Sequence, residues 1–328
     1  MPKASKLENK PLTDPTVSVI IPTFQHARLG HVEQCITSLE EQTYDPDEII
    51  IIADNTNSDP SSRTLFDYLN DSYGNNSLIT VVPDNEKRSV TDARNEAVKH
   101  ADGDVYAFID DDAIAAPDWL ENLAEGYKQG YPAVGGRAAP IWEASEQQPW
   151  TLPQEMWWLV GVTHRGFVDL DQENEEQEVR NTYACNFSVR AEVFDTLGGF
   201  QQDLGKDYGH NYQAEEAELG HRMRKALDKG TLYIPEALVH HKVFPIQQTL
   251  GYLLDRAFWQ GFAKAQLFPD TWEEENEEFQ LLFRDALPTY TKSDPLAALA
   301  ILVLFFATGF GYAAGFTRRI LAALGIRK

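Results

Sequence analysis

The sequence predicts an α/β protein built on an open, mostly parallel sheet with flanking helices. Short apolar runs rich in β-favouring residues alternate with helical segments, the joins between them are short, and polar residues follow the strands. Parallel strands are buried on both faces and therefore read as continuous apolar runs. The chain has 328 residues, 43% of them hydrophobic, which is enough for one large domain or two smaller ones.

The elements of the N-terminal half follow in order. Residues 1–16 are polar and are expected to be flexible; they lack the apolar core of a signal peptide. The expected strands are 17–22, 48–53, 78–82 and 105–109, and the expected helices are about 31–42, a segment ending near Asn70, and 91–100 with Thr91 as its cap. A further helix is expected over 215–227, where Leu219, Met223 and Leu227 recur at four-residue spacing.

Three consecutive acids, Asp110, Asp111 and Asp112, end the fourth strand. Ligands bind at the carboxyl ends of strands in open α/β sheets. Adjacent carboxylates repel one another and raise one another's pKa values, and a hard divalent cation relieves that repulsion. Oxygen ligands favour Mg²⁺ or Mn²⁺. The alternative for an acid triplet alone is a solvated acidic turn.

The charge balance excludes one class of partner. The net charge is −23, with 51 acids against 28 Lys and Arg, spread over most of the chain. Nucleic-acid binding needs clustered cations, so no nucleic-acid partner is expected. A dense acidic surface is typical of halophilic proteins, and a halophilic source is our hypothesis. The two cysteines, Cys35 and Cys185, predict neither a disulfide framework nor a zinc site and are expected to be small buried hydrophobes.

Six short motifs make the sequence similar to family 2 glycosyltransferases, whose nucleotide-sugar domain has the GT-A fold. In the order expected for that family they are VSVIIPTF (17–24), ADNTNSD (53–59), TDARNE (91–96), FIDDD (108–112), LGGF (197–200) and EEAEL (215–219). Each motif alone is weak evidence, whereas six in order are strong. The resemblance implies a GT-A domain over residues 17–243.

The resemblance assigns several residues to a nucleotide-diphosphate sugar donor. Asp54 should accept a hydrogen bond from a uridine-type base, although it could instead cap the next helix. Arg94 should contact the diphosphate with Asp92 nearby, although an arginine at a helix start can also be solvated. Pro22 and Phe24 belong to the opening motif that borders the donor.

The resemblance also assigns the metal ligands. Asp112 should bind the ion directly, and Asp110 should flank it nearer the ribose. Asp111 is expected among the donor-binding residues but pointing away from the metal, because side chains alternate at a strand end. His241 should reach the metal or diphosphate, with His240 as the alternative and a hydrogen-bonded structural histidine as the plainer one.

Inverting transfer needs a base on the acceptor side of the sugar carbon. Glu216 stands where the family has its catalytic aspartate, and Glu215 precedes it, so either could be the base. A charged first helical turn is the structural alternative. Asn186 and Gly199 match acceptor-side positions. A membrane setting favours a lipid-linked acceptor such as a dolichol-phosphate glycan of archaeal N-glycosylation.

The C-terminal region predicts membrane association. An amphipathic and acidic helical region is expected over 244–294, and residues 296–316 then run 21 positions without a charge, long enough to span a bilayer. Arg318, Arg319, Arg327 and Lys328 favour a cytoplasmic tail. Because nucleotide sugars are cytoplasmic, the catalytic domain should also lie on the cytoplasmic face. A single span cannot place both the tail and the catalytic domain there. A re-entrant or in-plane helix, with 320–326 as a second apolar piece, would resolve the conflict.

Two other readings stay open. A polysaccharide synthase or nucleotidyl transferase could use the same scaffold, but no Gln-x-x-Arg-Trp motif is evident, and residues 23–30 do not resemble a nucleotidyl transferase loop. A non-catalytic membrane-tethered sugar-binding module would not need the acid triplet together with Glu216.

Overall fold

The computed structural model describes residues 7, 10–56, 63–86, 88–143, 152–168, 175–201, 214–267 and 280–325. Contacts divide the chain into two units. The first comprises Met1–Ala139, Asn174–Gln202 and Glu215–His241, and the second comprises Pro140–Glu173, Asp203–Ala214 and Lys242–Lys328. The 140–173 segment therefore groups with the C-terminal helices. The acidic stretch expected over 271–278 lies outside the described residues.

The parallel sheet predicted from the sequence lies in the first unit. Its strands have the spatial order β3-β2-β1-β4, and all three pairings are parallel. The strands are β1 (Val17–Thr23), β2 (Glu48–Asp54), β3 (Ile79–Asp84) and β4 (Val105–Phe108). This order brings the carboxyl ends of β1, β2 and β4 to one edge, since β2 and β4 flank β1.

The sheet continues beyond β4 as an antiparallel half, making nine strands in the described part of the chain. The order is β4-β8-β6-β9-β5, with β7 also pairing with β9. The added strands are β5 (Ala113–Ala115), β6 (Ala133–Trp142), β7 (Gln177–Val179), β8 (Phe187–Arg190) and β9 (Thr231–Val243). Most of this half was not predicted, because its strands are short or contain glycine and proline.

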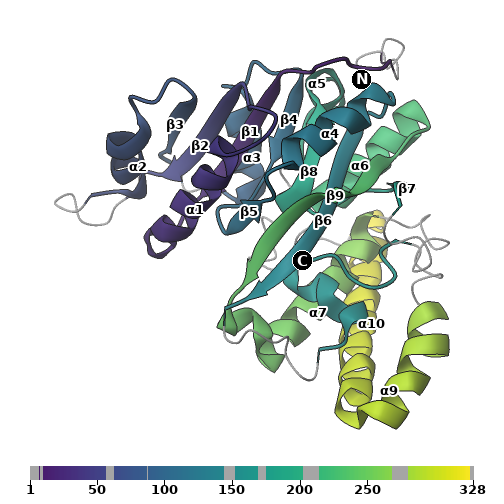
Figure 1. Ribbon diagram of the computed structural model, residues 1–328. Helices are drawn as coiled ribbons and strands as arrows, with labels where there is room; N and C mark the ends of the chain where they lie inside the picture. Colours follow the sequence, from purple (N-terminus) through teal and green to yellow (C-terminus); the bar gives the residue numbers. More distant parts are fainter. Residues whose placement is uncertain are drawn as a thin grey trace. The chain divides into compact units, whose positions relative to one another are not determined.

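Helices cover both faces of the sheet (Figure 1), and the strand residues alternate between them. In β1, Val19 and Ile21 pack with one cluster and Ile20 with the other. The first face carries α1 (Leu29–Glu40), α2 (Leu65–Tyr73) and α4 (Trp119–Lys128); the second carries α3 (Val90–Val98), α5 (Ala191–Leu197) and α6 (Glu215–Leu227). The predicted α/β class and flanking helices are confirmed.

Some boundaries differ from expectation for local reasons. Helix α3 begins one residue before Thr91, because the side chain of Ser89 accepts a hydrogen bond from the Asp92 amide and caps the helix. Part of the N-terminal segment expected to be flexible is held in place. The Leu12 amide donates to the Tyr127 carbonyl, and Thr16 bonds the Asp104 carboxylate.

The second unit is helical. It contains η2 (Gln154–Val160), η5 (Pro245–Gln248), α7 (Leu250–Leu267), a π-helical turn (Leu282–Ala286), α9 (Leu287–Ser293) and α10 (Pro295–Ala323). Its core includes Met156, Leu159, Leu253, Ile301 and Leu304. Helix α10 runs unbroken through Ala323, so the second apolar piece expected after residue 320 continues the same helix.

Helices α7 and α10 meet at glycines. A Cβ at Gly261 would collide with the backbone of Thr308, and one at Gly311 would collide with the backbone of Phe258. A Cβ at Gly315 would lie 2.6 Å from the Phe262 carbonyl oxygen. Phe262 and Gly315 each follow the pair Phe258 and Gly311 by four residues, so α7 and α10 run in the same direction at backbone contact distance.

The other side of α10 is apolar and exposed. Leu299, Phe306 and Phe310 are 55%, 60% and 71% exposed. Within the described residues, α10 is the one helix long and apolar enough to cross a membrane, with a mean hydropathy of 2.1 over its best window, 28% of which is buried.

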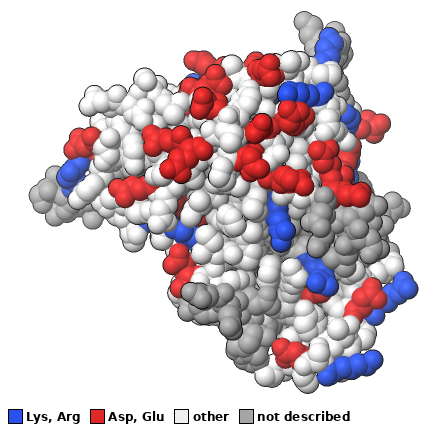
Figure 2. Space-filling view, viewed as in Figure 1, with Lys and Arg blue, Asp and Glu red and all other residues white. Residues whose placement is uncertain are grey.

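The acidic surface expected from the composition is visible on the first unit. Figure 2 shows Asp and Glu side chains spread over its strands and helices on the face in view, with few Lys and Arg among them. This arrangement gives nucleic acid no cationic patch on that face.

Candidate active site

The acid triplet lies at the carboxyl edge of the parallel sheet, between an arginine and a histidine. Arg28, in the short helix η1 (His26–Arg28) after β1, donates to Asp111 Oδ1 at 3.0 Å and to Asp112 Oδ2 at 2.9 Å. The Thr23 hydroxyl, at the end of β1, donates to Asp111 Oδ2 at 2.7 Å. Asp111 is buried and shares Arg28 with Asp112; its orientation relative to a bound metal stays a prediction.

Asp112 also faces His241 of β9. Its Oδ1 lies 3.4 Å from His241 Nε2, and both residues are buried. Burial alone would raise the pKa of Asp112, but His241 and Arg28 outweigh it and hold that pKa below its ordinary value. Burial would lower the pKa of His241, but Asp112 raises it above the usual range. The pKa of Asp111 rises to about 6 through burial and the neighbouring charge of Asp112.

Arg94 connects the acid triplet to helix α6. Its guanidinium is 3% exposed and donates to Asp110 Oδ1 at 2.7 Å and to Glu215 Oε1 at 3.1 Å. Burial would lower the pKa of Arg94, but Asp110, Glu215 and Glu216 together raise it. Arg94 is therefore neither solvated nor a loose helix-start cation; it lies between two carboxylates.

Glu216 follows Glu215 in the first turn of α6. One carboxylate oxygen accepts a hydrogen bond from the Ala184 amide at 3.0 Å. Part of the residue stays exposed while Glu215 is buried. Burial of the carboxylate and the neighbouring charge of Glu215 raise the pKa of Glu216 to about 8. A carboxyl group with such a pKa is largely protonated at neutral pH and is a stronger base than an ordinary carboxylate once it is ionised.

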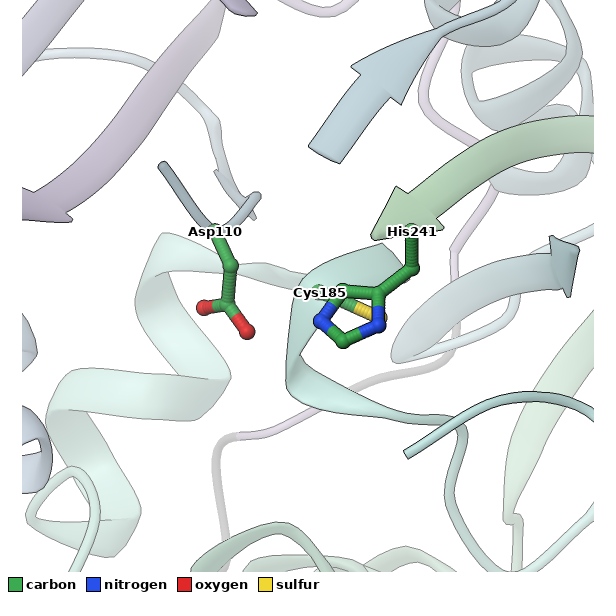
Figure 3. Close-up of side chains that lie close together, drawn as sticks. All are labelled: Asp110, Cys185 and His241. Atoms are coloured by element: carbon green, nitrogen blue, oxygen red, sulfur yellow. The ribbon is translucent and has the colours of Figure 1, made fainter. Parts of the chain in front are cut away.

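Ligand atoms for a cation gather around Asp110 and His241 (Figure 3). Ligand atoms of Asp110, Cys185 and His241 all lie within 4.8 Å of one another. Two buried atoms beside this cluster, Asp112 Oδ1 and His241 Nδ1, have no hydrogen-bond partner among the described residues. Carboxylate oxygens and imidazole nitrogens are suitable ligands for Mg²⁺ or Mn²⁺, so these residues fit a divalent cation.

His241 and His240 differ in placement. His241 pairs with Ala113 in the β5–β9 ladder and is buried beside Asp112. Neighbouring residues of a strand point to opposite faces, so His240 faces away from Asp112. Burial, with the charge of Arg137, lowers the pKa of His240.

Two residues that were predicted to bind the nucleotide-sugar donor accept local hydrogen bonds. Asp54 Oδ1 accepts from the amide and the hydroxyl of Thr56, at 2.8 and 2.6 Å, which shapes the turn after β2. Asp92 lies in the first turn of α3, where its Oδ2 accepts from the Ser89 hydroxyl. Pro22 is buried within β1 and Phe24 packs against the second-face core. Their contacts with a nucleotide sugar stay predictions.

The acceptor-side residues have structural contacts. Gly199 has φ +70°, and a Cβ there would meet Asn95 Oδ1, which accepts from the Phe200 amide. Asn186 is fully buried: its amide group donates to the carbonyls of Arg137 and Ala237 and accepts from Trp119. Asn186 thereby ties β6, β9 and α4 together, and its contact with an acceptor stays a prediction.

Sequence reasoning missed Thr23, Arg28 and Cys185 as members of this cluster. Thr23 and Arg28 follow β1, and their place at the carboxyl edge is the signal that could have identified them. Cys185 gave no such signal, because it reaches the site only through η4 (Ala184–Asn186) at the start of β8.

Comparison with known proteins matches residues 18–198 to the model of glycosyl transferase family 2. The chain is also similar to a glucosyl-dolichyl phosphate glucuronosyltransferase of Haloferax volcanii, with 32% identity over 91% of this chain and 96% of the relative.

Two solved structures share the fold. A mannosyltransferase of Pyrobaculum calidifontis in complex with GDP-Man and Mn²⁺ aligns with a TM-score of 0.52 and 19% identity, covering 98% of this chain and 90% of that one. GalNAc-T7 with UDP, GalNAc and Mn²⁺ aligns with a TM-score of 0.52 and 17% identity, covering 86% of this chain and 58% of that one. At these identities the likeness establishes the GT-A fold alone.

Proposed function

This chain belongs to glycosyl transferase family 2, and from that premise we propose that it transfers a sugar, with inversion, from a nucleotide diphosphate to a lipid-linked glycan. The observation that carries the proposal is that Arg94 contacts both the acid triplet and Glu215, the residue before Glu216. Arg94 binds both Asp110 and Glu215, so a proton-accepting carboxylate and the cation-binding aspartates share one buried charge network.

Asp110, Asp112 and His241 would hold the divalent cation, Mg²⁺ or Mn²⁺. When bound, the cation supplies positive charge that stabilises the departing nucleotide diphosphate. Arg28 neutralises Asp111 and Asp112 and orients their carboxylates. Asp54 would accept from the base of the nucleotide at its second oxygen, since its first is bonded to Thr56.

Glu216 would take the proton from the attacking hydroxyl of the acceptor. Its raised pKa makes it a stronger base than an ordinary carboxylate. Glu215 is less suited to this role, because its carboxylate is buried and bonded to Arg94. We therefore assign Glu215 to positioning Arg94 and Glu216 to proton transfer.

The acceptor proposal rests on the relative in Haloferax volcanii, whose name specifies a glucosyl-dolichyl phosphate substrate and glucuronosyl transfer. That relative is matched over 96% of its length. A polyprenyl-phosphate-linked saccharide is therefore the first acceptor to test, and a nucleotide-activated hexuronic acid the first donor.

The C-terminal helices would hold the protein at the membrane, with the catalytic domain on the cytoplasmic side. We favour an in-plane α10 over a spanning one. Helix α7 packs along α10 at Gly261 and Gly311 and carries Asp255, Arg256 and Lys264. A spanning α10 would draw these charges to the depth of the hydrocarbon, which is costly. An in-plane α10 places only its exposed apolar side chains in lipid.

The activity test uses the full chain with Mn²⁺ or Mg²⁺, a panel of nucleotide sugars and a polyprenyl-phosphate-linked glucose. A product one sugar longer, with inverted anomeric configuration by NMR, is expected. Release of nucleotide diphosphate without a glycosylated lipid would contradict the acceptor assignment. Metal-dependent donor binding without turnover would favour the sugar-binding module, and a long polymer would favour the polysaccharide synthase.

The membrane test is flotation with liposomes. Changing both Phe306 and Phe310 to Asp should release the protein, whereas Tyr68→Asp, at an exposed aromatic of the first unit, should not. Protease can also be added to sealed vesicles that carry the catalytic domain on their outer face. Protection of the C-terminal tail would then show a span and refute the in-plane arrangement.

A further inference from the structure

The cation cluster contains a thiol that none of the proposed catalytic roles uses. Cys185 is buried at the start of β8 and is not in a disulfide. Its sulfur lies within 4.8 Å of ligand atoms of both Asp110 and His241 (Figure 3). The site thus presents two overlapping sets of ligands, which share Asp110 and His241. One set adds the carboxylate of Asp112, and the other adds the sulfur of Cys185.

The two sets suit different metals. Carboxylate ligands favour Mg²⁺ and Mn²⁺, whereas thiolate favours softer ions, and sites with nitrogen, oxygen and sulfur bind Zn²⁺ more tightly than Mn²⁺. We propose that Asp110, Cys185 and His241 form a second, soft-metal site that takes Zn²⁺ in competition with the catalytic cation. Three protein ligands with one position left for water or substrate is a common arrangement for zinc.

The geometry needs only small adjustments. With metal–ligand bonds of about 2.0–2.3 Å, ligand atoms around tetrahedral zinc lie roughly 3.4–3.7 Å apart. Because the three ligand atoms lie within 4.8 Å of one another, they need to approach by at most about 1.4 Å. Asp110 is well placed to move, because its side chain is 28% exposed and only its Oδ1 is bonded to Arg94. His241 offers Nδ1, which is buried without a hydrogen-bond partner among the described residues.

The chemical step is a ligand exchange. The S–H bond of Cys185 breaks, an S–Zn bond forms, and the proton passes to solvent; no atom changes oxidation state. Binding therefore weakens as pH falls, since protons compete with the metal for sulfur. Arg28 holds Asp112 through Oδ2, so the soft set can form without Asp112.

Zinc binding at this site does not depend on the proposed function. One consequence of it, inhibition of sugar transfer, does rest on the proposed function. Zn²⁺ held by Asp110 and His241 removes two ligands from the catalytic cation. Micromolar Zn²⁺ should then inhibit Mn²⁺-supported transfer, and inhibition should require Cys185.

The test is spectroscopic and uses the metal-free full chain with Co²⁺ as the probe. Cobalt bound through sulfur absorbs in the near ultraviolet by thiolate-to-metal charge transfer. We expect this band in the wild type and in Cys35→Ser, a matched change at the only other cysteine, but not in Cys185→Ser. Added Zn²⁺ should remove the band by displacing Co²⁺. Loss of Cys185 should weaken Zn²⁺ binding at least about 10- to 100-fold, since even losing an outer-shell partner costs that much.

Absence of the sulfur band in wild-type protein, or its persistence in Cys185→Ser, overturns the proposal. If Cys185→Ser does not fold, Cys185→Ala and X-ray absorption of the zinc-bound wild type replace it, and a zinc shell without sulfur is equally negative. Transfer assays separate the two proposals: a cobalt–sulfur band without sugar transfer refutes only the catalytic function, and transfer without the band refutes only the soft-metal site.

Discussion

The first unit gathers charged side chains inside the protein, whereas the second leaves large apolar side chains outside. Arg94, Asp112 and Glu215 are between 3% and 6% exposed. Phe306 and Phe310 of α10 are 60% and 71% exposed. Each arrangement is unfavourable for a protein in water, because buried charges lose hydration and exposed apolar surface promotes association. These two features are the ones to which we assign the proposed partners, a cation and donor for the first unit and lipid for the second.

The sharpest way to break this comparison is to remove the proton acceptor from the charged network. Glu216→Gln keeps the size and the hydrogen bond from Ala184 but loses basicity. We expect transfer to fall by about 10²- to 10⁴-fold, the usual contribution of a general base. Donor binding, measured by calorimetry, should persist. Glu125→Gln, an exposed acid on α4, is the control, and unchanged transfer in Glu216→Gln would remove Glu216 from the mechanism.

Replacing Arg94, the arginine at the centre of the charge network, tests how much the network contributes to stability. Arg94→Gln leaves Asp110 and Glu215 without their shared partner, so we expect a loss of about 3–5 kcal/mol of unfolding free energy by chemical denaturation. Adding Glu215→Gln should restore part of that loss, because one of the two stranded charges is then gone. A double variant as unstable as the sum of the single ones would show that the pair is not coupled.

The pH dependence of transfer sharpens the assignment of the base. Glu216 acts as a base only when ionised, and burial and Glu215 raise its pKa to about 8. The rate at saturating metal and substrates should rise about tenfold per pH unit below 8 and level off above it. A rate independent of pH between 6 and 8 would mean that the carboxylate titrates elsewhere or is not the base.

A paired glycine experiment probes the second unit. Gly311→Ala puts a methyl group against the backbone of Phe258 and should cost about 1–3 kcal/mol by overpacking. Gly309→Ala, two residues away in the same helix, meets nothing within 4 Å. It should stabilise the helix by about 1 kcal/mol, since alanine favours helix over glycine. Equal effects in thermal unfolding would contradict the close α7–α10 contact.

The two units also differ in how far the sequence predicts them. The apolar strands and the acid triplet follow local patterns, so the parallel half of the sheet and its edge were predictable. Arg28 follows β1 directly, so its place at that edge could have been used, whereas Cys185 reaches the site only through the tertiary placement of η4, which no local pattern specifies. The length of α10 was predictable from its uncharged run, but its contact with α7 depends on Gly261 and Gly311 facing each other, which no local pattern specifies.

The exposed stripe of α10 has a consequence for attachment in concentrated salt. Proteins that bind membranes through lysine and arginine dissociate as ionic strength rises, because mobile ions screen the attraction between these side chains and anionic lipids. Between Leu296 and Phe316 the helix has no charge to screen. Salting-out ions strengthen the association of apolar surfaces instead. The proposed membrane adhesion through this helix should therefore become stronger, not weaker, in concentrated salt.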